Sequence, residues 1–118
     1  MVTRSDILKY VEDNYETKPE YLWARDPGSA VLRHRQNRKW YGIIMDVPRN
    51  KVGLDGDEII DILDLKGEPE MIAHLVTQKG FCPGYHMNKQ HWLTIILDGT
   101  VEDEEIYNLI DISYEMTK

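Results

Sequence analysis

The chain has 118 residues, of which 42% are hydrophobic and 30% charged, and its formal net charge is −7 at pH 7. This length and composition are typical of one globular domain, so residues 1–118 are expected to form a single unit rather than a disordered or fibrous chain. The acidic balance disfavours non-specific binding to polyanions, and no apolar run approaches the roughly 20 residues of a membrane-spanning helix.

The cysteine content and the first residues favour a reducing compartment. Cys82 is the single cysteine, so an internal disulfide is excluded. The chain opens on the polar stretch Met1–Asp6, which lacks the apolar core of a signal peptide. We therefore expect a cytoplasmic protein without a membrane partner.

The N-terminal part of the chain predicts one helix followed by strands. Thr3 resembles a helix cap, and the apolar spacing that follows predicts an amphipathic helix over 4–16. A first extended segment is expected to begin at 21–23 and a short strand at 30–34. A hairpin turn at Gln36-Asn37 then leads into a longer strand over 39–47, which is apolar on both faces.

The second half of the chain predicts two more strands and two more helices. Residues 59–65 fit either a helical turn or a strand, and their β-branched side chains favour the strand. A helix is expected over 68–79, a strand over 92–97 and a last helix over 101–116. Short connections between these elements predict a two-layer α+β domain, in which about three helices pack on an antiparallel sheet of about five strands.

Positive charge is concentrated around the predicted hairpin. Residues 33–51 carry six basic side chains and one acidic side chain. A basic β-ribbon with neighbouring aromatic residues, here Trp40 and Tyr41, can bind nucleic acid through phosphate contacts and base stacking. The same pattern also suits a solvated hairpin whose long side chains cover apolar surface, so both interpretations stay open.

The stretch Phe81–Trp92, F-C-P-G-Y-H-M-N-K-Q-H-W, is the densest collection of functional side chains. Cys82, His86 and His91 are ligand types that zinc uses, but no fourth ligand stands nearby in the sequence. A nucleophilic Cys82 would need an exposed thiol with a low pKa, and its apolar neighbours favour partial burial. No phosphate-binding glycine motif is present. We therefore expect no enzyme, no metal and no cofactor.

Several of these segments together resemble the MmcQ/YjbR family. The most specific match is Tyr85-His86-Met87-Asn88-Lys89-x-His91-Trp92, followed by an apolar strand, Asp98-Gly99 and a helix with Ser113-Tyr114. Weaker matches are Arg38-Lys39-Trp40-Tyr41 and Leu63-Asp64-Leu65-Lys66, and Gly67 stands where relatives often carry a cysteine. The resemblance implies a compact α+β domain of the CyaY-like type. It also implies DNA binding through a double-wing arrangement of hairpins, and it brings no catalytic residues or cofactor.

Two hypotheses about function follow. In the first, the protein is a DNA-binding domain with the phosphate-contacting residues Arg33, Arg35, Arg38, Lys39 and Lys89. In the alternative, it is a protein- or small-ligand-binding module without catalysis, with a cleft lined by Tyr85, His86, Lys89 and Trp92. The sequence specifies neither the physiological ligand nor the oligomeric state.

Overall fold

The computed structural model describes residues 1–118, which form a five-stranded antiparallel sheet in the order β1-β2-β3-β5-β4. The strands are β1 (Ala30–Arg33), β2 (Trp40–Pro48), β3 (Ile59–Lys66), β4 (Phe81–Pro83) and β5 (Trp92–Ile96). The helices are α1 (Arg4–Tyr15), α2 (Pro69–Leu75) and α3 (Asp103–Met116), together with the short 3-10 helix η1 (Arg49–Val52). The expected two-layer α+β architecture is confirmed.

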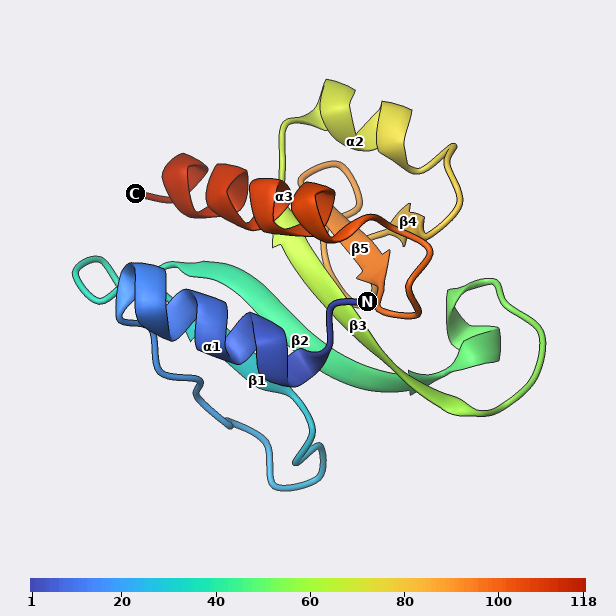
Figure 1. Ribbon diagram of the computed structural model, residues 1–118, viewed down its shortest axis with the longest axis horizontal. Helices are drawn as coiled ribbons and strands as arrows, with labels where there is room; N and C mark the ends of the chain where they lie inside the picture. Colours follow the sequence, from blue (N-terminus) through green and yellow to red (C-terminus); the bar gives the residue numbers. More distant parts are fainter.

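The three α-helices cover one face of the sheet, and α1 and α3 lie side by side across it (Figure 1). A capping box between Thr3 and Asp6 begins α1, as the sequence indicates. The main core lies under the helices and joins Ile7 and Val11 of α1 and Ile106 and Ile110 of α3 to alternate strand residues. Burial of these apolar faces is what holds the helices on the sheet.

The opposite face of the sheet, here called the second face, carries a smaller apolar cluster. Its buried members are Val31, Ile43, Met45, Val47, Val52, Ile62 and Ile96. No α-helix packs against this cluster, and its cover comes instead from side chains of loops, including Leu54, Tyr85 and Met87. Because a loop leaves more openings than a helix does, the second face is where a ligand can approach the sheet.

The predicted elements agree with the structure except at three places. Residues 21–23 form no strand, because the chain turns at Asp26 and only Glu20 pairs, through one bridge to Val31. Helix α2 ends at Leu75 rather than near residue 79, where tight turns lead to Gly80 at φ 92°. Strand β4 was not expected from the Cys-Pro sequence. It lies at the sheet edge, where Pro83 loses no ladder hydrogen bond.

Ser113 fastens α3 to the sheet at the point where the β2–β3 ladder ends. Its hydroxyl donates to the carbonyl oxygen of Tyr41 at 2.5 Å and accepts from the amide of Lys66 at 2.9 Å. Both backbone groups lie beyond the last paired residues, Gly42 and Leu65. A buried hydroxyl therefore supplies the hydrogen bonds that the missing next pair would have made. None of the helices is both long enough and apolar enough to cross a bilayer.

Candidate ligand-binding site

The basic residues of the hairpin are largely neutralised by carboxylates. Arg38 donates to Glu20 at 2.6 Å, and the Arg33 guanidinium lies 3.6 Å from the same carboxylate. Arg35 forms an ion pair with Glu16. Lys39 has no carboxylate partner. Three of the four hairpin cations therefore lie beside a carboxylate, but two carboxylates shared by three guanidinium groups leave one positive charge uncompensated.

The carboxylates that neutralise the hairpin come from the chain segment just after α1. Glu16 caps the helix in the left-handed region at φ 56°, which turns the chain toward the sheet edge. Glu20 then pairs with Val31 on β1 and reaches the arginines. The sequence signal for this arrangement was weak, because the acids and the bases that they pair with lie 13 to 19 positions apart.

A hollow with a volume of about 760 Å³ lies at this junction. It is lined by Glu12, Glu16, Thr17, Lys18, Pro19, Glu20, Arg33, Arg35 and Arg38. Both acids and bases line it, and no hydrophobic side chain contributes. Arg33 Nε is buried without a hydrogen-bond partner, but the hollow offers a ligand no hydrophobic side chain, so its size alone does not make it a binding site.

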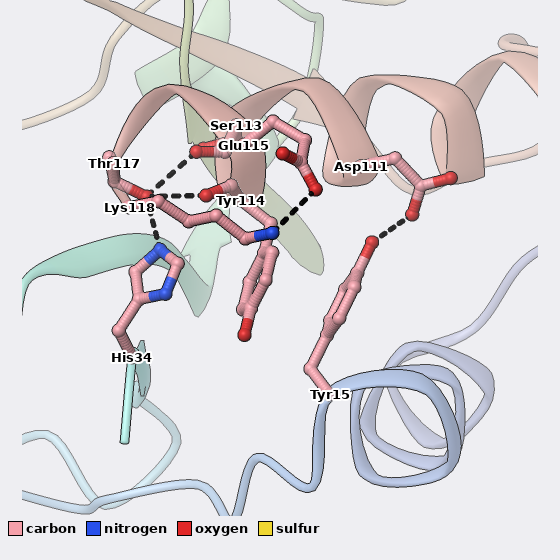
Figure 2. Close-up of polar contacts among 8 residues, drawn as sticks. All are labelled: Tyr15, His34, Asp111, Ser113, Tyr114, Glu115, Thr117 and Lys118. Carbon is pink, nitrogen blue, oxygen red and sulfur yellow. Dashed lines mark hydrogen bonds and ion pairs between the residues drawn. The ribbon is translucent and has the colours of Figure 1, made fainter. Parts of the chain in front are cut away.

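The end of the hairpin is tied to the C-terminal end of α3 (Figure 2). His34 is buried, and its Nε2 lies 2.6 Å from the hydroxyl of Thr117. Burial holds the pKa of His34 below its usual value, so the ring is neutral at pH 7. Figure 2 also shows Tyr15 of α1 donating to Asp111 of α3. These contacts position the elements and leave little unmet hydrogen-bonding capacity.

Lys89 lies apart from the hairpin cations. It belongs to the loop of residues 84–91 that joins β4 to β5, at the sheet edge opposite β1. Its ammonium donates to the carbonyl oxygen of Gly84 at 2.9 Å. The five cations predicted to contact phosphates therefore form two groups on different parts of the molecule.

A polar row crosses the second face beneath this loop. Asp64 of β3 pairs with Thr94 of β5, and Thr94 pairs with Cys82 of β4. The Thr94 hydroxyl donates to Asp64 Oδ1 at 2.5 Å and accepts from the Tyr85 amide at 2.8 Å. Asp64 has no solvent exposure, and its Oδ2 has no hydrogen-bond partner. Such an unsatisfied buried carboxyl is rare in native proteins and is often functional.

The buried row changes the ionisation of two groups. Burial raises the pKa of Asp64 to about 7, opposed by the Thr94 hydrogen bond and the nearby Lys89 charge. Burial and the neighbouring Asp64 raise the pKa of the Cys82 thiol. The cysteine is therefore a protonated, half-buried group at pH 7, which does not suit a nucleophile.

A hollow of about 310 Å³ opens beside this row, and we call it the Lys51–Lys89 hollow. It is lined by Lys51, Val52, Gly53, Cys82, Pro83, Tyr85 and Lys89. The residues come from η1 and the turn after it, from β4, and from the 84–91 loop. No acidic residue lines it, and three of its seven lining residues are hydrophobic.

The structure brings together only part of the predicted ligand site. Tyr85 and Lys89 line the hollow. His86 is exposed beside Tyr85, with ring centroids 4.0 Å apart. Trp92 is buried against Gly84 and under the ammonium of Lys66, and it does not line the hollow.

Two residues of the site were missed by the sequence analysis, Lys51 and Asp64. A signal existed for the second, since Asp64 stands between two leucines in the predicted strand. His91 is exposed, and Cys82, His86 and His91, which the sequence analysis weighed as ligand types for zinc, form no group of three or more metal-ligating side chains.

Comparisons with known proteins place this fold in a family. The YjbR family model matches residues 13–116. Uncharacterized protein YyaQ of Bacillus subtilis is 50% identical over the full length of both chains, and Uncharacterized protein YjbR of Escherichia coli K12 is 44% identical over 55 residues, 45% of this chain and 46% of its own. A crystal structure from Pseudomonas syringae superposes with a TM-score of 0.96 at 41% identity, covering 99% of this chain and all of that one.

A more distant solved structure agrees. A Deinococcus radiodurans protein with a DUF419 domain has a TM-score of 0.76 at 26% identity, covering 98% of this chain and 78% of that one. The likenesses and the sheet order define the class, a two-layer α+β domain with an open antiparallel sheet. The chain belongs to the YjbR family, so the resemblance noted in the sequence is confirmed. The relatives from B. subtilis and E. coli are described only as uncharacterised.

Proposed function

We propose that the protein is a small-ligand-binding domain whose site is the Lys51–Lys89 hollow on the second face of the sheet. The observation that carries this proposal is the fully buried Asp64, whose Oδ2 lacks a partner and whose charge interacts with Lys89 and Cys82, two residues that line the hollow. A fold keeps an unsatisfied buried carboxyl at a cost of about 1–3 kcal/mol, which selection removes unless the group has a use.

The dimensions and chemistry of the hollow support a small molecule. About 310 Å³ lies at the lower end of the roughly 300–1,000 Å³ typical of ligand pockets. Tyr85, Val52 and Pro83 offer apolar contact, and Lys51 and Lys89 offer hydrogen-bond donors. A macromolecular partner would need a much larger surface than this.

A fragment screen followed by NMR on isotope-labelled protein tests the proposal. We expect hits to shift the amide signals of residues 51–53 and 82–89 together, and to leave the signals of 34–38 unchanged. Tyr85→Ala should weaken these hits at least tenfold, because it removes the largest apolar surface of the hollow. The matched control is Tyr21→Ala, an exposed tyrosine outside the site. A screen whose hits all lie away from the 82–89 segment would refute the proposal.

Duplex DNA is a second candidate ligand, favoured by one specific observation. Arg35 and Arg38 are 65% and 54% exposed at the hairpin, so their ion pairs with Glu16 and Glu20 lie at the surface. Exposed ion pairs contribute only about 0–1 kcal/mol and can be exchanged for phosphate contacts. DNA binding requires the arginines to exchange their carboxylate partners for phosphates. The ligand-binding proposal uses Lys51 and Lys89, which have no carboxylate partner.

A further inference from the structure

We propose that the ligand of the Lys51–Lys89 hollow is a small organic anion, whose carboxylate or phosphate group is bound by the ammonium groups of Lys51 and Lys89. This inference rests on the proposed function and specifies the chemical class of its ligand. It assigns charge recognition to two lysines that lie 38 positions apart in the chain and meet only in the folded protein.

The first argument is the distribution of unpaired positive charge. Lys9, Lys18 and Lys118 each have a carboxylate within 4.0 Å. The other five lysines have none, although the chain carries a net charge of −7, and two of these five, Lys51 and Lys89, line the same hollow. Two unpaired lysines around one hollow on an acidic protein attract an anion and disfavour a cation.

The second argument is the state of the Lys89 ammonium. Its one hydrogen bond goes to the carbonyl oxygen of Gly84, a neutral acceptor. An ammonium has three donors, so two remain for a ligand. The bond to Gly84 holds the side chain at the hollow and reduces the entropy that ligand binding would otherwise cost. Lys89 is thus positioned in advance for an anion.

The third argument concerns the rest of the lining. Val52, Pro83 and the Tyr85 ring provide apolar surface next to the two lysines. An inorganic ion would leave this surface wet, whereas a short alkyl or aryl group would cover it. The hollow therefore favours an organic acid or a phosphate monoester over a free inorganic ion.

Asp64 lies near Lys89 and Cys82 and modulates the site. The charged or titratable groups that influence it are Lys89 on the loop and Cys82 on β4, and Thr94 on β5 and the Tyr85 amide hydrogen-bond nearby. The β2 neighbour, Ile43, is apolar. An ionised Asp64 would oppose an incoming anion, and a protonated one would not. Anion affinity should therefore fall as the pH rises from about 6 to about 8, and Asp64→Asn should remove most of that fall.

The test uses a fragment library made of matched pairs, each carboxylate with its primary amide and each phosphate monoester with its parent alcohol. Binding is read from the NMR signals of residues 51–53 and 82–89. We expect the anionic member of a pair to bind at least tenfold more tightly than its neutral partner. Lys51→Met/Lys89→Met should remove that preference. Lys79→Met, which changes an exposed lysine outside the hollow, should retain it.

The outcomes separate the inference from the proposed function. Neutral members that bind at the hollow as well as the anions, or anions that bind the double variant unchanged, overturn the anion inference and leave the ligand-binding function standing. The absence of any binder at the hollow from both halves of the library overturns both. Thermal unfolding of each variant confirms that it is folded. A preference for phosphate esters over carboxylates, or the reverse, identifies which anion the lysines recognise.

Discussion

At the scale of single residues, Asp64 is a buried carboxyl group that lowers the stability of the fold. Its alternation with Ile62 puts it on the second face, within a row of otherwise uncharged side chains. The neighbouring Thr94 satisfies only one of its two oxygens. Replacing such a group by an apolar residue would be expected to stabilise the domain, so its presence indicates a role other than stability.

Asp64 should make the domain less stable as the pH rises through the weakly acidic range. Its pKa is about 7 in the native state and about 4 in an unfolded chain, so between these values the native state holds a proton that the unfolded state has lost. The free energy of unfolding therefore falls by up to about 1.4 kcal/mol per pH unit over this range. The stabilisation that Asp64 gives by holding its proton in the native state is fully present below pH 4 and is lost above pH 7.

Urea denaturation of the wild type and of Asp64→Asn at pH 5 and pH 8 measures this effect. We expect the variant to gain stability relative to the wild type at pH 8, because an amide needs no deprotonation. The pKa of His34 is lowered, so His34 makes the domain less stable as the pH falls below about 6.5. Both proteins contain His34, so its effect cancels when their free energies of unfolding are subtracted. If the free energy of unfolding depended on pH equally in both proteins, the pKa of Asp64 would not be raised in the native state.

At the scale of elements, the 84–91 loop determines the shape of the site. It begins at Gly84, which packs directly on the start of β5, and it carries both Tyr85 and Lys89 to the hollow. Gly84 also accepts the hydrogen bond from Lys89 and donates its amide to the carbonyl oxygen of Trp92. The loop conformation therefore depends on a close backbone approach that a larger residue would block.

Gly84→Ala should destabilise the domain by roughly 1–3 kcal/mol, the usual cost of overpacking. The added Cβ would lie 2.7 Å from Trp92 Cβ and 2.9 Å from its carbonyl oxygen, and neither atom belongs to a flexible chain end. Thermal unfolding measures the loss. Gly28→Ala is the matched control, because Gly28 has no positive φ and its added Cβ would meet only the exposed, flexible side chain of Asp46. A smaller loss at Gly84 than at Gly28 would show that the loop moves away easily.

The elements also indicate how far sequence reasoning can go. The ambiguous segment at 59–65 is a strand as expected, because its β-branched residues suit a pleated sheet. Strand β4 escaped prediction because three residues that include a proline carry no periodic pattern. Its existence depends on pairing with β5, a contact that is not local in the sequence.

At the scale of the whole molecule, the distribution of charge decides between the two candidate ligands. The hairpin looked basic because its acidic partners lie in another part of the chain. In the fold, Glu16 and Glu20 pair with Arg33, Arg35 and Arg38, which reduces the positive charge of the three arginines from three to one. Lys89 lies on the loop at the opposite edge of the sheet, so no single surface combines all the predicted phosphate contacts.

The DNA candidate makes a prediction about removing those acids. Glu16→Gln/Glu20→Gln should bind duplex DNA more tightly than the wild type at about 50 mM salt, because it frees arginines for phosphate contacts, and the binding should weaken steeply with salt. Arg35→Glu/Arg38→Glu should bind no duplex and should keep nearly the same melting temperature. Fluorescence anisotropy with a labelled duplex measures all three proteins. No binding by the wild type or the glutamine variant at this salt concentration would remove DNA as a candidate.

The sequence by itself determined the positions of the three α-helices and of every strand except β4, the α+β class and the family, because periodic apolar spacing, caps and a specific local motif are short-range properties. It also placed Tyr85 and Lys89 in the right loop. Only the tertiary structure decided which charges meet. The α1–β1 segment forms its ion pairs with the hairpin through long-range packing. Long-range packing also brings Lys51 and Lys89 to the same hollow. No local pattern of residues specifies either arrangement.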